Sequence, residues 1–417
     1  MLRSILNAFK SPELRKKIAF TFALLAIYRF GTYVPVPGVN TSQIGNAINS
    51  QGAANVLQFL NLFSGGALTR FSVFALGIMP YITASIVMQL MTVVVPSLEK
   101  LQKEGEAGYA KITQYTRYLT VVLAFFQSLA YVLFFRSVDA LQGLSFGRLY
   151  LIVLSLTTGT ILVMWLGELI TQRGIGNGIS LMIFASIVAS IPTGVRRWWE
   201  LEPVSKIIIG VMAVGVVVAV VFMNEGERRI PIQYAKRVVG RRMTQGGTTY
   251  MPLRVNMAGV IPVIFAASIV ILPSLFATLI GGSFFTSLRD FLSPNSWFYI
   301  LFEALLIVVF TYFYTAVQFN PVDQAENLKK YGGFIPGVRP GRPTAVYLDR
   351  VMTRLTLPGA LYLAAIATLP SIIFKYMPQV NFTFGGTSLL IVVGVAIDTM
   401  RQLEAQLMQR QYEGFLK

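Results

Sequence analysis

Ten apolar segments, each close to the length that crosses a lipid bilayer, recur along this chain. A bilayer core about 30 Å thick requires about 20 apolar residues in a helix, and lipid offers no partners for backbone polar groups. Of the 417 residues, 54% are hydrophobic and only 13% are charged, which leaves too little polar surface to cover soluble domains. The sequence therefore predicts an all-α membrane protein with ten transmembrane helices, at residues 18–36, 71–95, 118–135, 149–167, 179–192, 207–223, 257–280, 297–319, 355–374 and 387–401.

Two residue types are missing, and their absence narrows the possible chemistry. The chain has no His and no Cys, so it cannot form a Ser-His-Asp triad, a disulfide or a cysteine-ligated zinc site. Ionisable residues within the predicted helices are isolated from one another. Arg29 and Glu168 lie near helix ends, where long side chains reach the interface, while Glu303 and Asp398 belong to other helices. We therefore expect no enzyme, no catalytic residue, no cofactor and no metal site.

Basic residues are distributed unevenly between the two sides of this topology. With an even number of helices both termini share one side, and that side carries 26 of the 35 Lys and Arg residues against 8 on the other. The positive-inside rule places the side rich in basic residues in the cytoplasm. We therefore expect a multi-pass protein with both termini and the long loops 224–256 and 320–354 in the cytoplasm.

The first external segment has an unusual composition. Residues 31–69 contain no charged residue, although the stretch is too long for a tight turn. Within it, residues 55–64 are apolar at helical spacing but cover only about half a bilayer. Two interpretations remain open: an amphipathic helix at the membrane interface, or a re-entrant half-helix inside a vestibule of the protein.

Two of the predicted helices share a motif that indicates an internal repeat. Gly77-Ile-Met-Pro-Tyr-Ile-Thr-Ala-Ser-Ile-Val lies in the second helix, and Gly259-Val-Ile-Pro-Val-Ile-Phe-Ala-Ala-Ser-Ile-Val lies in the seventh. Because each half has five helices, the halves 1–200 and 201–417 cross the membrane in opposite directions, as in inverted repeats with a functional site between the halves. We expect Gly and Pro to bend both helices along a seam that can open, although kinks without functional consequence are also common in membrane helices.

Isoleucines, rather than polar residues, lie near the middle of the repeated helices. Ile78, Ile82 and Ile264 lie there, and Ile183 and Ile391 lie at comparable depth in the fifth and tenth helices. A narrow apolar constriction excludes water and blocks ions, so such a set is a poor binding site but an effective seal. The alternative is that these side chains face lipid or pack between helices.

The two long cytoplasmic loops are dense in basic residues. Loops 224–256 and 320–354 hold 13 Lys and Arg residues, and three prolines stiffen the second loop. Such surfaces are typical of docking to an RNA phosphate backbone or to an acidic protein. The docking candidates are Arg237, Arg241, Arg242, Arg339 and Arg342.

Several longer motifs resemble the SecY family, the channel subunits of the bacterial Sec protein translocon. The resemblance runs from about Ser11 to Tyr412, almost the whole chain. It rests on Ser64-Gly-Gly-Ala-Leu, Ala75-Leu-Gly-Ile-Met-Pro, Ile112-Thr-Gln-Tyr-Thr-Arg, Met164-Trp-Leu-Gly-Glu, Arg173-Gly-Ile-Gly-Asn-Gly-Ile-Ser, Val255-Asn-Met-Ala-Gly, Pro336-Gly-Val-Arg-Pro-Gly and Phe384-Gly-Gly-Thr-Ser-Leu-Leu.

This resemblance implies a clamshell of two inverted five-helix halves around a pore, in which the second and seventh helices form a lateral gate to lipid. The implied pore ring comprises Ile78, Ile82, Ile183, Ile264 and Ile391, with a sixth position near Ala267 and Ser268. The implied plug is a re-entrant half-helix at residues 55–70, and includes Asn55, Leu57, Phe59, Leu60, Leu62, Phe63, Ser64, Gly65 and Gly66. The implied gate residues are Pro80, Thr83, Ser85, Gln127, Asn256, Pro262 and Ser268, of which Thr83, Gln127 and Asn256 match a polar cluster that bridges the closed gate.

By the same resemblance, the protein conducts unfolded secretory polypeptides across the bacterial inner membrane and releases apolar segments sideways into lipid. The implied partners are SecE, SecG, the SecA motor ATPase, the ribosome with its RNA as the sole nucleic acid, signal sequences and nascent polypeptides. Arg241 and Arg339 match basic loop residues that engage SecA or the ribosome. The main alternative is an inverted-repeat secondary transporter of a small solute, which requires an essential buried ionisable residue.

Overall fold

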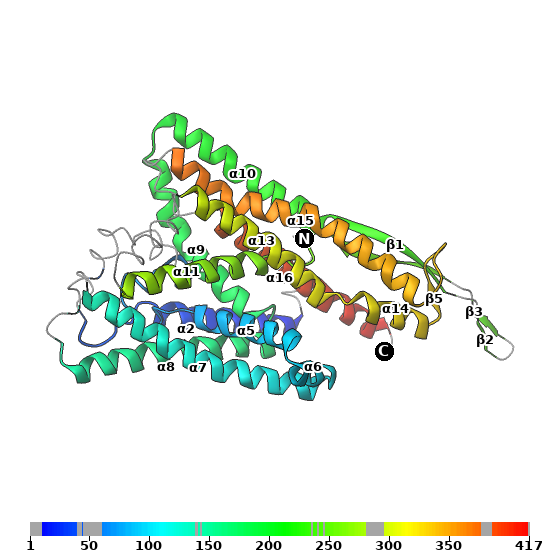
Figure 1. Cartoon of the computed structure of the whole chain (residues 1–417), viewed down its shortest axis with the longest axis horizontal. Helices are drawn as coiled ribbons and strands as arrows, with labels where there is room; N and C mark the ends of the chain where they lie inside the picture. The colour runs from blue at the N-terminus through cyan, green and yellow to red at the C-terminus, as the bar shows by residue number, and fades with distance from the viewer. Residues whose placement is uncertain are drawn as a thin grey trace.

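The computed structural model is an elongated bundle of helices that extends at one end into a small sheet (Figure 1). It describes residues 11–39, 44, 61–137, 141, 144–234, 237–239, 242–244, 247–280, 296–376 and 386–415. The helices are α2 (Pro12–Gly31), α5 (Met79–Val94), α6 (Pro96–Lys103), α7 (Glu106–Ser137), α8 (Phe146–Arg173), α9 (Gly178–Trp199), α10 (Pro203–Glu225), α11 (Ile261–Ile280), α13 (Trp297–Gln318), α14 (Pro321–Lys330), α15 (Arg342–Tyr376) and α16 (Gly386–Phe415).

Each of the ten predicted segments overlaps a helix, and the expectation of an all-α membrane protein is confirmed. By length and composition, six of the described helices are able to cross a membrane, and the bent pair α5 and α6 makes a seventh if it is counted as one span. The axes of that pair differ by 99° at Pro96, where the preceding Val95 is extended. The other three predicted spans are α2, α11 and α16. Both α2 and α16 combine an apolar stretch with a charged end.

The repeated motif marks the start of a helix in each half, which corrects the expectation that its Gly and Pro bend helix interiors. Residues 71–78 form turns, and α5 begins only at Met79; α11 likewise begins at Ile261. Pro80 and Pro262 are therefore the second helical residues, where the missing N–H would be unpaired in any case. The glycine three residues before each proline has a positive φ, +58° at Gly77 and +63° at Gly259. This conformation turns the chain into the helix.

The two long basic loops are joined into one sheet, which the sequence analysis did not predict. Strand β1 (Glu227–Tyr234) pairs antiparallel with β4 (Thr248–Arg254), and β5 (Gly333–Phe334) from the second loop pairs with the far end of β1, giving the order β4-β1-β5. Strands β2 (Arg237–Val239) and β3 (Arg242–Thr244) pair separately. On β1, Ile230 and Ile232 are buried while the flanking residues are exposed, the alternation typical of a strand with one covered face.

The hydrophobic core crosses the whole bundle. One continuous cluster of buried apolar side chains includes residues of α2, α5, α7, α8, α9, α10, α11, α13, α15 and α16. Helices α5, α7 and α8 pack in sequence order, and α11, α13 and α15 do the same in the second half of the chain. Contacts of α11 with α5 and α7, and of α16 with α9, connect the two halves.

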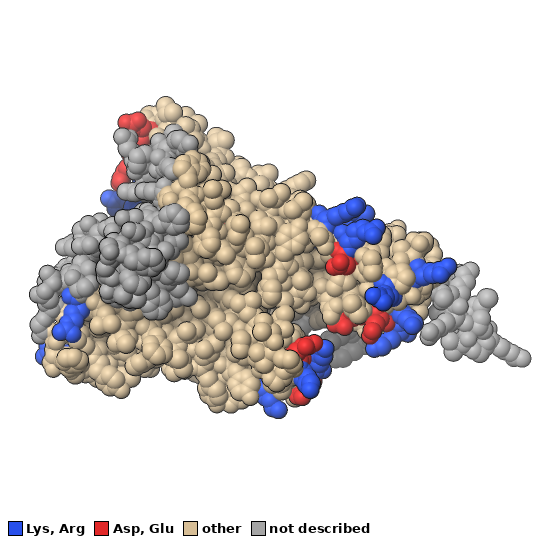
Figure 2. All heavy atoms as spheres, viewed as in Figure 1, with Lys and Arg blue, Asp and Glu red and all other residues tan. Residues whose placement is uncertain are grey.

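Charge is concentrated at one end of the molecule. In Figure 1, α6, α14, β1 and the C-terminal end of α16 lie at the same end of the bundle. In the view of Figure 2, many of the visible Lys and Arg side chains gather at that end, while the middle of the bundle carries few charges. This arrangement fits a membrane-embedded middle with its larger polar surface on one side.

Helix α8 packs closely against the chain at Val73, and Gly159 lies at the contact. A Cβ placed there would overlap the carbonyl oxygen of Val73, so the chain at 71–78 approaches α8 only because this residue has no side chain. We expect Gly159→Ala to destabilise the protein by about 1–3 kcal/mol through overpacking. Thermal unfolding in detergent measures the effect as a lower midpoint.

Gly215 provides the matched control for this substitution. It also lies inside a helix, α10, but a Cβ there has nothing within 4 Å. Gly215→Ala is expected to leave the midpoint unchanged or slightly higher, because alanine is the better helix former. Equal midpoints for the two variants would contradict the close approach of α8 to Val73.

Candidate functional site

All five candidate isoleucines are buried in the core of the bundle. Ile78 immediately precedes α5 and Ile82 follows one turn later, while Ile183, Ile264 and Ile391 come from α9, α11 and α16. Each side chain is at most 7% exposed, and all five belong to the continuous core cluster. The structure therefore places them inside the protein rather than against lipid.

Small residues of α8 and α11 accompany these isoleucines. A Cβ on Gly167 would lie 3.5 Å from Cδ1 of Ile78, so α8 runs directly past the start of α5. On α11, Ala267 and Ser268 are also buried. The Ser268 hydroxyl donates to the backbone carbonyl of Ile264 at 2.7 Å, which satisfies this polar group within its own helix.

The described part of the plug segment lies inside the protein. Asn55, Leu57, Phe59 and Leu60 lie outside the described residues, whereas the stretch from Leu62 to Gly65 is buried. The Cα of Ser64 lies 3.4 Å from the position of a Cβ on Gly77, so the segment rests against the start of α5. Gly66 N–H donates to the carbonyl of Asn61 at 2.8 Å and closes the turn. Burial of this stretch favours the re-entrant interpretation over a helix at the interface.

An isolated antiparallel bridge between Pro35 and Ser72 joins the chain on the two sides of the uncharged segment. Val36 N–H donates to the carbonyl of Phe71, and Val73 N–H donates to the carbonyl of Val34, both at 3.0 Å. Phe71 has a φ of +44° and is fully buried, with its ring edge-on to Phe135 at a centroid distance of 5.3 Å. The uncharged segment 31–69 thus leaves and re-enters the bundle at the same place.

Arg29 and Glu168 do not simply reach towards the interface, as their positions near helix ends suggested. The Arg29 guanidinium donates to the carbonyl of Gly65 in the plug segment at 2.5 Å. Glu168 of α8 forms an ion pair with Arg117 of α7 at 2.8 Å. Both contacts join residues that are far apart in the sequence, so helix periodicity alone could not reveal them.

The lateral-gate candidates lie on helices that meet, but their hydrogen bonds remain within each half. Helices α5 and α11 pack against each other, and they carry Pro80, Thr83, Ser85, Pro262 and Ser268. The Thr83 hydroxyl donates to the carbonyl of Met79 at 3.0 Å, and the Asn256 amide donates to Oδ1 of Asn224 at 2.9 Å. Gln127 is half-buried on α7. A polar bridge among Thr83, Gln127 and Asn256 therefore remains a prediction.

The docking candidates lie at the charged end of the molecule. Arg339 and Arg342 are exposed at the start of α15, where the Arg339 carbonyl accepts a hydrogen bond from Thr344. Arg237 and Arg242 belong to the paired strands β2 and β3. Arg241 lies outside the described residues.

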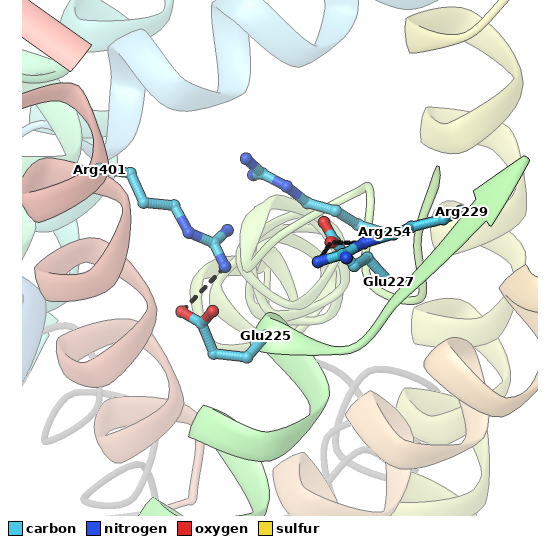
Figure 3. A pocket seen from close by; sticks show the side chains of 5 residues that line it. All are labelled: Glu225, Glu227, Arg229, Arg254 and Arg401. Atoms are coloured by element: carbon cyan, nitrogen blue, oxygen red, sulfur yellow. Dashed lines mark hydrogen bonds and ion pairs between the residues drawn. The ribbon is translucent and has the colours of Figure 1, made fainter. Parts of the chain in front are cut away.

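A charged cavity of 460 Å³ lies where α10, β1, β4 and α16 meet (Figure 3). Two ion pairs line it, between Arg401 and Glu225 at 3.0 Å and between Arg229 and Glu227 at 2.8 Å, and Arg254 completes the lining. Arg401 also donates to the backbone carbonyl of Asn224 at 2.9 Å and so ties α16 to the end of α10. Sequence reasoning missed this cavity because its residues come from three separate stretches of the chain.

Comparison with known proteins identifies relatives that cover the whole chain. A family model described as SecY matches residues 72–400. A protein translocase subunit SecY from Streptomyces galbus is 48% identical, with both chains fully covered. A solved SecY structure, in which the plug domain stabilises the closed state of the translocation channel and maintains a membrane seal, has a TM-score of 0.66 at 19% identity, over 93% of this chain and 91% of that chain. Sec61 in the canine ribosome-channel complex has a TM-score of 0.62 at 18% identity, over the same shares of the two chains.

Proposed function

The chain belongs to the SecY family of protein translocase subunits, and from that premise we propose that it is a protein-conducting channel. In this function it passes unfolded secretory polypeptides across the membrane and releases apolar segments sideways into lipid. The observation that carries the proposal is the 48% identity to a SecY translocase subunit over the full length of both chains. The burial of Ile78, Ile82, Ile183, Ile264 and Ile391 supports their assignment to a pore ring. Membership of this family also sets aside the alternative of a small-solute transporter.

The isoleucine region acts as the seal of the resting channel. Apolar side chains offer water no hydrogen bonds, so a constriction of this kind excludes water and blocks ions. Isoleucine side chains can pack around an extended polypeptide that passes between them, because dispersion contacts do not depend on direction. The ring therefore closes without a specific binding site for any one substrate.

The plug is the segment that ends at Gly65 and Gly66. Its described part is packed beside Ile78, which fits a stopper that lies on one side of the isoleucine ring. In the related SecY structure, a plug domain stabilises the closed state of that channel. For this chain we infer that the segment moves away when a polypeptide enters the pore.

The lateral gate opens between α5 and α11. Because Thr83 and Asn256 form hydrogen bonds within their own halves, separation of the two helices leaves those bonds intact. The surfaces that separate are largely apolar, and an apolar segment of the substrate can replace them. Its transfer from water into this environment stabilises the open state.

The basic loops form a cytoplasmic platform for partners. Strand β5 joins loop 320–354 to the sheet of loop 224–256, so the two loops present one surface. The partners inferred for this chain are SecE, SecG, the SecA motor ATPase and the ribosome, and ribosomal RNA phosphates are natural targets for arginine. With this platform inside the cell, both termini are cytoplasmic and the protein lies in the bacterial inner membrane.

An engineered disulfide tests whether the plug has to move during transport. The position of a Cβ on Gly65 lies 3.4 Å from the Cβ of Ser186 in α9, close to the separation of about 3.5–4.5 Å found in disulfides. The chain contains no other cysteine that could interfere. In the double variant Gly65→Cys, Ser186→Cys, we expect oxidation to block transport of a secretory precursor into membrane vesicles and reductant to restore it.

The two single-cysteine variants are the controls for this experiment. Neither can form the intramolecular bond, so the oxidant should leave their transport unchanged. Transport by the fully cross-linked double variant at the rate of its reduced form would show that this segment does not need to move.

A charge reversal tests the docking surface. We expect Arg339→Glu to reduce SecA-driven or ribosome-coupled precursor transport about tenfold, because it puts a negative charge on a surface that binds acidic groups. Lys111→Glu on α7 is the matched control, since Lys111 is exposed in the segment 96–117 assigned to the same side of the membrane. A transport assay on vesicles with equal amounts of each variant makes the comparison. Equal transport by the two variants would contradict a docking role for Arg339.

A further inference from the structure

We propose that Arg29 is a positioning residue that holds the plug segment in the closed channel, through a hydrogen bond to the carbonyl oxygen of Gly65. The inference rests on the proposed plug function, and it assigns the retention of the plug segment to the Arg29 side chain. Arg29 belongs to the last turn of α2, a helix that carries none of the five isoleucines. The closed state is therefore maintained by a polar latch as well as by an apolar seal.

Arg29 and Arg70 bracket the uncharged segment, and the structure brings them together. No charged residue lies between them in the sequence. Both guanidinium groups lie over the ring of Tyr33, with their carbon atoms 5.1 Å and 3.9 Å from its centroid. Arg29 also donates to the Tyr33 hydroxyl at 3.2 Å. The two guanidinium groups thus meet at Tyr33, where the chain leaves and re-enters the bundle on either side of the uncharged segment.

The backbone contact of Arg29 reaches into the plug segment itself. Its Nη1 donates to the Gly65 carbonyl at 2.5 Å, a charge-assisted hydrogen bond and hence one of the stronger types. None of the ion pairs among the described residues involves Arg29 or Arg70. Among the described residues, the Arg29 guanidinium is therefore directed at this carbonyl, at Tyr33 and, at 3.5 Å, at the Thr32 hydroxyl, and not at a carboxylate.

Glycine at position 65 is what allows this approach. A Cβ there would lie 2.9 Å from Nη1 of Arg29, and the φ of +66° is unfavourable for any other residue. Gly65 also faces α9, because Ser186 Cα lies 3.3 Å from the same Cβ position. Ser186 is itself fixed by a buried hydrogen bond to the Tyr28 hydroxyl at 2.7 Å. Gly65 thus faces both a fixed residue of α9 and the Arg29 guanidinium.

Ion leakage through the resting channel tests the latch. The full chain, reconstituted with its partner subunits into vesicles, is assayed for salt flux in the absence of precursor. We expect Arg29→Gln to raise the leak about tenfold, because loss of a charge-assisted hydrogen bond shifts the balance towards the unlatched plug. Arg29→Lys is expected to leak less than Arg29→Gln, since an ammonium group can still donate to the carbonyl. Arg148→Gln, which removes an exposed charge at the start of α8, should match the unaltered protein.

Gly65→Ala tests the same contact by changing the residue that accepts the hydrogen bond. Its methyl group displaces the guanidinium while Arg29 stays intact, so we expect a raised leak in this variant too. Covalent rescue provides a readout that general damage to the fold would not reproduce. In the triple variant Arg29→Gln, Gly65→Cys, Ser186→Cys, oxidation fastens the segment to α9 and should return the leak to the level of the unaltered protein.

The outcomes separate the latch from the plug itself. Deletion of residues 57–67 is expected to raise the leak whether or not Arg29 is the latch. If that deletion variant leaks and the Arg29→Gln variant remains sealed, the proposed role of Arg29 is wrong, while the plug function is supported. If the deletion variant also remains sealed, both the plug function and the role of Arg29 are contradicted. A leak in the triple variant that persists after oxidation places the damage outside the plug and overturns the latch.

Discussion

The structure depends on one constraint: backbone polar groups inside the membrane have to find partners within the protein. The chain from Asn61 to Ile78 is mostly non-helical, yet it runs through the interior of the bundle and meets this constraint with turns. Gly66 N–H bonds to Asn61, Ser72 N–H to Ala67, and Gly77 N–H to Phe74. These turns place Ile78 at the very start of α5 and leave the plug segment beside it. A continuous helix over residues 71–95 would fill this space and could not carry a movable stopper.

The closed channel that we propose combines two kinds of interaction, which respond differently to a substrate. The isoleucine region is held by burial, which depends on area and tolerates small changes of shape. The contact between Arg29 and Gly65 depends on one geometry and on the absence of a side chain at position 65. A polypeptide that enters the pore can replace the apolar contacts with its own. The polar contact gains no such substitute, so opening loses it, and the contact both positions the segment and stabilises the closed state.

Much of this fold could be predicted from local patterns, and the remainder depends on contacts over long distances in the sequence. Apolar length located all ten helices, and the repeated motif found the related starts of α5 and α11. The same motif misled about bending, because Gly-x-x-Pro within an apolar run looks the same at the start of a helix as in its interior. The sheet was missed although the buried Ile230 and Ile232 alternate with exposed residues, since the basic residues of the loop dominated the pattern. Nothing local indicates that Arg29 meets Gly65, or that Phe71 adopts a positive φ.

In the proposed channel, a polypeptide passes between the halves, through the region of the five isoleucines. Site-specific photo-cross-linking during transport tests it most directly, with a photoreactive residue in place of Ile82 on α5 or Ile264 on α11. Val218 on α10 is the reference position, because its side chain is 61% exposed on the outside of the bundle. We expect a secretory precursor arrested in transit to cross-link to positions 82 and 264 and not to 218. Cross-links absent from both inner positions, in vesicles that carry the arrested precursor, would contradict it.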